Sequence, residues 1–156
     1  MNATLTPVST PPAKVRRQPS AGAKRFGYVI GIVFNVAMYY VAHRLLEWEW
    51  PSFLTTEFND VLPYLSVSLI AGMITNALFI GYDAAWFKSV SNIVTSVISF
   101  VVGVQMYQVF PFDFSGYETD WAKIFRFAIV VGLVAIVMAV LVEVARLLRR
   151  LAPAHS

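Results

Sequence analysis

Residues 121–147 read WAKIFRFAIVVGLVAIVMAVLVEVARL, and no charged side chain lies between Arg126 and Glu143. The hydrocarbon layer of a bilayer is about 30 Å thick, so a helix that crosses it needs about 20 mostly apolar residues. A soluble helix of this length would instead carry polar residues along the side that faces water. The stretch therefore predicts a helix that spans a membrane.

Three further segments combine the same length with the same near absence of charge, namely residues 26–46, 61–82 and 89–109. The chain of 156 residues is 58% hydrophobic and 13% charged, whereas soluble domains average roughly 45–50% and 25%. The sequence therefore predicts an all-α fold, a membrane-embedded four-helix bundle within residues 26–150.

The two ends of the chain differ from the predicted spans. Residues 1–25 are rich in Pro, Ser, Thr and Ala and hold several basic side chains. They contain too little apolar surface to offset the entropy lost on ordering, which predicts a disordered basic tail. A cleaved signal peptide is a second interpretation, but the polar stretch is long and no small-x-small cleavage site follows Arg44. Residues 151–156 form a second, short tail.

Basic residues are distributed unevenly between the two sides of the predicted spans. If the N-terminus is cytoplasmic, nine of the 12 Lys and Arg residues lie on the cytoplasmic side and three on the other. Cytoplasmic loops carry the excess of Lys and Arg in membrane proteins, so we expect both termini in the cytoplasm. The nine cytoplasmic residues are Lys14, Arg16, Arg17, Lys24, Arg25, Lys88, Arg146, Arg149 and Arg150.

The sequence lacks the residues of several reaction classes. It has no cysteine, which excludes disulfides, thiol redox chemistry and thiolate metal sites. It also lacks the Gly-x-Ser-x-Gly, Gly-Lys-Ser/Thr and His-Glu-x-x-His motifs. We therefore expect neither enzymatic activity nor a cofactor, and a net charge of +3 is too small to indicate nucleic acid. The expected partners are the lipid bilayer and either further copies of the chain or another membrane protein.

Small and weakly polar residues recur at helical spacing within the spans. Lipid tails are as apolar as Leu, so spans associate through close packing and hydrogen bonds between helices. Gly31 stands four residues before Asn35, Gly72 stands four before Asn76, and the fourth span has small residues at 128, 132, 135 and 139. These stripes predict the surfaces on which the spans pack.

The third span has the most regular polar stripe, which alternates steps of three and four from Ser89 to Met106. This alternation is the spacing of a packed seam between two helices. It leaves two interpretations open, a packing surface or a polar path along the third helix, and it makes Asn76 and Asn92 possible hydrogen-bond partners. The candidate packing or path residues are Asn35, Asn76, Asn92, Ser96, Ser99 and Gln105.

Ionisable residues are absent from the middle of the spans. A charge there costs about 2.5–3.5 kcal/mol on insertion scales, so a retained one usually has a function. Glu143 comes nearest, but Arg146 follows three residues later and predicts a local ion pair. Small multidrug transporters of similar length depend on an embedded Glu in the first span. Asn35 stands near that depth here and cannot take up and release a proton.

His43 lies beside Arg44 and four residues before Glu47, at the predicted outer end of the first span. Its imidazole predicts either an interfacial side chain that reaches water or a sensor of pH or of a metal ion. The outer loops also carry the carboxylates of Asp113, Glu118 and Asp120, but their spacing matches no calcium loop.

Three segments carry a resemblance: the first span with Asn35, residues 53–63, and residues 107–114, which read YQVFPFDF. In these segments the chain resembles small bacterial four-helix integral membrane proteins of unknown function, over most of its length beyond the N-terminal tail. The resemblance implies a multi-pass protein of the bacterial cytoplasmic (inner) membrane and implies no site. The opening Arg25-Phe26, with the following Gly31 and Asn35, is also similar to the small four-span lipid-linked-sugar translocators of the GtrA-like type.

Three functions remain compatible with these features. The first is a non-enzymatic membrane component, either oligomeric or an accessory subunit of a larger complex. The second is a small transporter or channel with a polar path along the third helix. The third is an extracytoplasmic sensor of pH or cations that works through His43 and the acidic loops.

Overall fold

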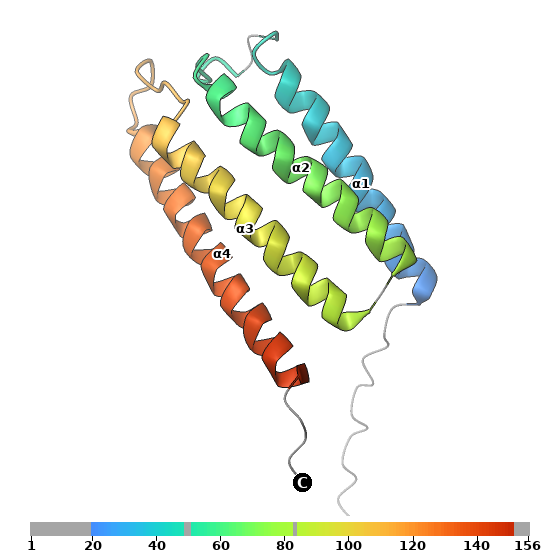
Figure 1. The fold of residues 1–156 in the computed structure, drawn as a ribbon. Coiled ribbons are helices and arrows are strands. Elements are labelled where there is room, and N and C mark those ends of the chain that lie inside the picture. Colours follow the sequence, from blue (N-terminus) through green and yellow to red (C-terminus); the bar gives the residue numbers. More distant parts are fainter. Residues whose placement is uncertain (1–19, 49–50, 83, 152–156) are drawn as a thin grey trace, which may run out of the picture.

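The computed structural model describes residues 20–48, 51–82 and 84–151, with side chains up to Arg149. These residues form four long helices and no strand beyond one isolated bridge between two loops, so the all-α prediction is confirmed (Figure 1). Each helix is long and apolar enough to cross a membrane. The helices are α1 (Ala21–Arg44), α2 (Phe58–Gly81), α3 (Ala85–Val109) and α4 (Trp121–Leu151).

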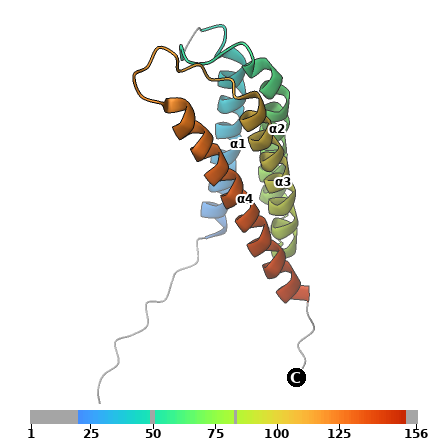
Figure 2. The same cartoon turned by 90° about the vertical axis from the view of Figure 1, so that its left-hand side faces the viewer.

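The four helices run antiparallel and pack in chain order, α1 against α2, α2 against α3, and α3 against α4. Among the described residues, the backbone of α1 packs against neither α3 nor α4, so the four-helix bundle is an open row (Figure 1). Figure 2 shows that α4 is inclined to the other three helices. Each inner helix therefore has two neighbours, whereas α1 and α4 have one each.

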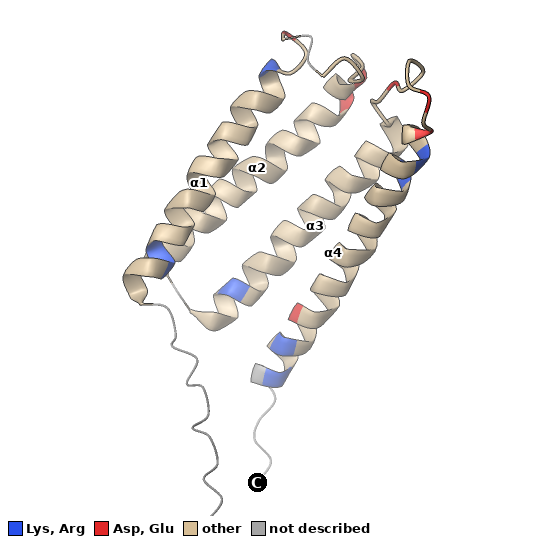
Figure 3. Cartoon of the chain, turned by 180° about the vertical axis from the view of Figure 1, so that it is seen from behind, with Lys and Arg blue, Asp and Glu red and all other residues tan. Residues whose placement is uncertain are grey.

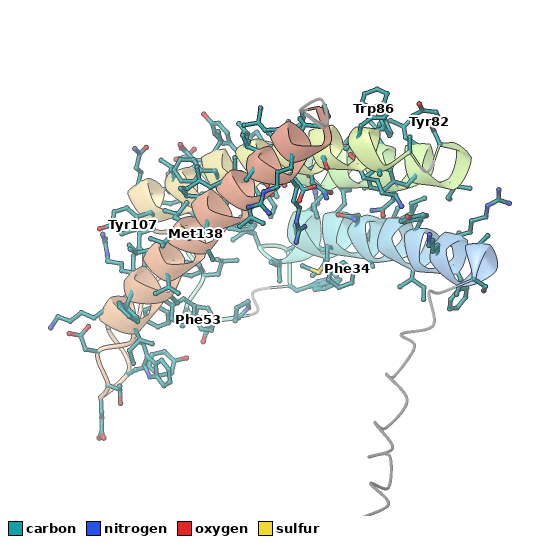
Figure 4. All side chains as sticks on the ribbon, turned by 90° about the horizontal axis from the view of Figure 1, so that it is seen from below. Phe34, Phe53, Tyr82, Trp86, Tyr107 and Met138 are labelled. Atoms are coloured by element: carbon teal, nitrogen blue, oxygen red, sulfur yellow. The ribbon has the colours of Figure 1, made fainter. Side chains whose placement is uncertain are left out.

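Large apolar side chains point outward along most of the row (Figure 4). Phe34 on α1 is 62% exposed and Phe127 on α4 is 71% exposed, while few side chains such as Val61 are fully buried. Soluble monomers rarely expose apolar patches of this extent. Figure 3 shows that charged residues gather at the two ends of the row and leave the middle free of them. The surface is that of a protein surrounded by lipid.

The helix ends explain where the predicted boundaries shift. Ser20 Oγ accepts a hydrogen bond from the Ala23 backbone N–H at 3.3 Å and caps α1, which therefore begins five residues before the predicted span. Residues 21–25 of the expected tail are thus helical, and residues 1–19 lie outside the described part. At α4, Asp120 Oδ1 accepts from the Lys123 N–H at 3.3 Å. This N-cap fixes the start of the longest helix.

Candidate functional site

Two asparagines and two glycines form the contact between the middles of α1 and α2. Asn35 Nδ2 donates to the Gly31 carbonyl at 2.7 Å, and Asn76 Nδ2 donates to the Gly72 carbonyl at 2.8 Å. Each amide thus bonds one turn back along its own helix and lies half-buried at the interface. The spacing of four residues places each asparagine directly over its glycine.

The two pairs are reciprocal across the interface. A Cβ atom built on Gly31 would lie 2.9 Å from the side-chain nitrogen and oxygen of Asn76, and one on Gly72 would lie 2.8 Å from Asn35 Oδ1. Each helix therefore receives the other's asparagine in the space that its own glycine leaves. We name these four residues the asparagine–glycine clasp.

The clasp corrects one hypothesis from the sequence. Asn76 lies against Gly31 of α1, and within the part of the chain that the structure describes no hydrogen bond joins it to Asn92 of α3. The sequence predicted a packing stripe on each helix, but not which stripe faces which. That information lies in the register between helices, which a single sequence does not contain.

The candidate polar residues of α3 point to different places. Ser99 Oγ lies 3.5 Å from Ser68 Oγ at the α2–α3 interface. Ser96 lines a shallow groove of about 210 Å³ between α3 and α4, whose other lining residues are apolar. Asn92 is exposed and Gln105 is half-buried. Ser96 and Ser99 thus lie at two different helix interfaces.

The α3–α4 contact is also fitted around a glycine. A Cβ on Gly103 would lie 2.7 Å from Leu133 Cδ2, so Leu133 occupies the space that Gly103 leaves. At the outer end of this contact the Arg126 guanidinium lies 4.2 Å from the centre of the Phe110 ring. Phe110 has a left-handed backbone (φ 45°) and ends α3. Sequence reasoning missed both contacts.

The two loops at the outer end are joined by backbone hydrogen bonds. The Thr55 N–H donates to the Pro111 carbonyl at 3.0 Å, and the Asp113 N–H donates to the Phe53 carbonyl at 2.8 Å. Leu54 and Phe112 form the isolated bridge between these bonds. We name this pairing of residues 53–55 with residues 111–113 the loop lock.

Aromatic rings cover the loop lock. The ring of Phe53 lies 5.2 Å from that of Phe114, and the ring of Phe125 lies 5.3 Å from Phe112 and 4.9 Å from Phe114. Such separations are those of favourable ring pairs. The segment YQVFPFDF, the most distinctive part of the resemblance, thus supplies one side of the loop lock.

The acidic loop beside the lock lines an open pocket of about 470 Å³ that includes Asp113, Glu118 and Asp120. The Ser115 backbone N–H donates to Asp113 at 2.9 Å and holds the pKa of that carboxyl below its ordinary value. Asp120 accepts hydrogen bonds from Lys123, whose Nζ lies 2.6 Å from Asp120 Oδ2. These bonds likewise hold the pKa of the Asp120 carboxyl below its ordinary value. Among the described residues, no group of three His or acidic side chains is placed to hold a metal ion.

His43 lies across the outer end of the α1–α2 contact. Its Nδ1 lies 2.9 Å from the Tyr39 carbonyl, which can only accept, so Nδ1 carries a proton and donates. Its Nε2 lies 3.5 Å from Ser66 Oγ, and Ser66 itself donates to the Leu62 carbonyl at 2.7 Å. The ring of His43 on α1 therefore lies beside Ser66 of α2.

Two ion pairs follow the helices near their ends. Glu47, the carboxylate four residues after His43, forms its ion pair with Arg44. Arg146 Nη1 lies 3.1 Å from Glu143 Oε2, as the spacing of three residues predicts. Glu143 is thus a locally paired carboxylate close to the end of α4.

Comparisons with models of protein families, with curated proteins and with solved structures each found no match to the chain.

Proposed function

We propose that the chain is a non-enzymatic component of a bacterial cytoplasmic membrane, with both termini in the cytoplasm, and that it assembles with further copies of itself. The observation that carries this proposal is the open row: α3 is the one described helix that packs against α4, and the other flanks of α4 are uncovered along the middle of the helix. An accessory subunit bound to a different membrane protein would use the same surface.

Small residues occupy one of the uncovered flanks of α4. An α-helix turns by about 100° per residue, so the flank that carries Gly132 lies about 100° around the helix from Leu133, which meets α3. A Cβ on Gly132 would meet no atom within 4 Å. Small residues let helix backbones approach closely in lipid, where packing drives association. We name this surface the small flank of α4; its residues are Ala128, Gly132, Ala135 and Ala139.

The test is the mass of the particle in nanodiscs or mild detergent. Gly132→Leu places a bulky side chain in the middle of the small flank and should convert an oligomer into a monomer. Val134→Leu, on the opposite flank of the same helix, is the control and should leave the oligomer intact. A wild-type protein that is monomeric at every concentration, and that brings down no partner, would contradict the proposal.

His43 favours a second candidate function, an extracytoplasmic pH sensor. With Nδ1 committed to Tyr39, Nε2 is the ring nitrogen that faces Ser66 Oγ, at 3.5 Å, so a change at this nitrogen would act on the contact between α1 and α2. The fluorescence of Trp48, whose ring lies 6.4 Å from Tyr40, reports on this end of α1. A pH-dependent signal that persists in His43→Gln would remove this candidate.

The transporter alternative requires a lumen that one chain does not supply. Four helices in an open row enclose no channel, so a path along α3 would have to form between chains. Replacement of Ser96 and Ser99 by Leu in reconstituted vesicles tests it, because flux that depends on this stripe would disappear.

A further inference from the structure

A small pocket opens at the end of the row where α1 begins and α2 ends. Its volume is about 170 Å³, several times the roughly 30 Å³ that a water molecule occupies in the liquid. Lys24 and Arg25 line one side, and the rings of Tyr28 and Phe79 line another. A cavity of this size has room for a phosphate group.

The aromatic wall of the pocket is held in place by its neighbours. The rings of Tyr28 and Phe79 lie 5.4 Å apart, and Phe79, only 8% exposed, packs edge-on against Phe87 of α3 at 5.9 Å. Lys88 Nζ lies 5.4 Å from the Tyr28 ring centre and 5.8 Å from that of Phe79. Lys88 of α3 thus lies near both rings, and Lys24 and Arg25 of α1 line the same pocket as the rings.

Charge and position together indicate the ligand. Of the described acidic side chains, only Glu143 stands at this end of the row, near the C-terminal end of α4, and it is paired with Arg146. The pocket lies where the apolar part of the helices gives way to charged residues, which is the depth of lipid headgroups. Basic pockets between membrane helices on the cytoplasmic side bind anionic headgroups.

We propose that this pocket binds the phosphate of an anionic phospholipid, with Arg25 and Lys24 as its charged ligands and Tyr28 and Phe79 as the wall beside the glycerol. Arg presents a planar fork of donors that matches phosphate oxygens. Lys carries three donors, so it can serve more than one acceptor. The proposal depends on the chain lying in a membrane and not on its assembly into oligomers, so each can fail without the other.

The test uses the full chain in nanodiscs of phosphatidylcholine that contain a small fraction of phosphatidylglycerol, followed by native mass spectrometry of retained lipid. The double variant Lys24→Gln with Arg25→Gln should retain phosphatidylglycerol at least about tenfold less, because the charge-assisted hydrogen bonds from both side chains to the bound phosphate are lost. The double variant Arg149→Gln with Arg150→Gln removes the same charge at the far end of α4 and should retain it as the wild type does. Equal losses in both variants would show general surface attraction and overturn the site.

Two further arms complete the test. The charge-conserving double variant Lys24→Arg with Arg25→Lys should restore retention if the variants fold alike by circular dichroism. Inorganic phosphate added at the concentration of lipid phosphate should not displace the lipid. Displacement by inorganic phosphate would assign the pocket to a soluble anion and overturn the lipid assignment.

Discussion

The asparagine–glycine clasp makes the α1–α2 contact sensitive to a single methyl group. Both glycines stand where the partner helix inserts an asparagine, and both asparagines are fixed by a bond to their own helix. Such an amide gives the contact a defined register, because sliding the helices by one turn would press Cβ atoms against it. The polar residues of this interface therefore position the helices.

Gly31→Ala should destabilise the α1–α2 contact, because its Cβ would lie 2.9 Å from the Asn76 amide. Overpacking of this kind costs about 1–3 kcal/mol. Gly27→Ala is the matched control one turn earlier, where a Cβ meets no atom within 4 Å. Thermal unfolding in detergent should show a lower midpoint for the first variant and an unchanged or higher one for the second, since Ala favours a helix. Equal midpoints would contradict the clasp.

Asp113 gives the acidic loop a dependence on pH. The Ser115 N–H stabilises the ionised carboxylate and lowers its pKa. The stabilisation is therefore full above the ordinary Asp pKa of about 3.9 and is lost as the pH falls through the lowered value. The Ser115 amide chemical shift should titrate with a midpoint below the ordinary Asp pKa of about 3.9, and Asp113→Asn should abolish the titration. A midpoint at or above the ordinary value would show that the hydrogen bond is absent.

At the scale of elements, the loop lock joins the two loops at the outer end of the row. The chain leaves α3 through a left-handed Phe110 and a buried Pro111, and then pairs with the loop before α2. This pairing joins two loops that are far apart in sequence. It also holds α2 and α4 to the same end of α3.

Phe112→Ala should loosen the loop lock. The Phe112 ring is half-buried among Phe53, Phe114 and Phe125, so its loss should cost about 2 kcal/mol, roughly half of the cost for a fully buried Phe. Hydrogen exchange at the Thr55 and Asp113 amides should accelerate, because both donate within the lock.

The control for this substitution lies on the lipid face. Phe127→Ala removes the same ring from a side chain that is 71% exposed. Its effect on exchange in the loops should be close to zero. Faster exchange at Thr55 in this variant, equal to that of Phe112→Ala, would show that the loops respond to α4 in general and not to the lock.

The elements differ in how far the sequence predicts them. The long runs without charge predict the four helices, and the fourth predicted span, which begins at Trp121, starts where α4 starts. The sequence predicts the start of α1 five residues too late. Ser20 caps the helix, but it lies in a stretch whose composition indicates a disordered tail. The loop lock and the clasp could not be predicted, because both depend on backbone contacts between distant segments. The spacing of four between each glycine and its asparagine pointed toward the clasp alone.

At the scale of the whole molecule, the open row turns apolar side chains outward on every helix (Figure 4). Within one chain, the interfaces are three narrow seams between neighbours; the α1–α2 seam is fitted around Gly31 and Gly72, and the α3–α4 seam around Gly103. The helices at the two edges have unpaired flanks, and α4 places its small residues on one of them. A lipid bilayer accommodates the apolar surface, and assembly through the small flank would give α4 a second neighbour.

A cysteine scan of α4 in native membranes tests this assembly most directly, because the chain has no cysteine of its own. Single cysteines at successive positions from 128 to 141 are oxidised, and the fraction of disulfide-linked dimer is measured. Disulfides require Cα atoms about 4.4–6.8 Å apart, so only facing positions should react. The account predicts maxima at Ala128, Gly132, Ala135 and Ala139. An even profile, or maxima on the flank of Val130 and Val134, would contradict it.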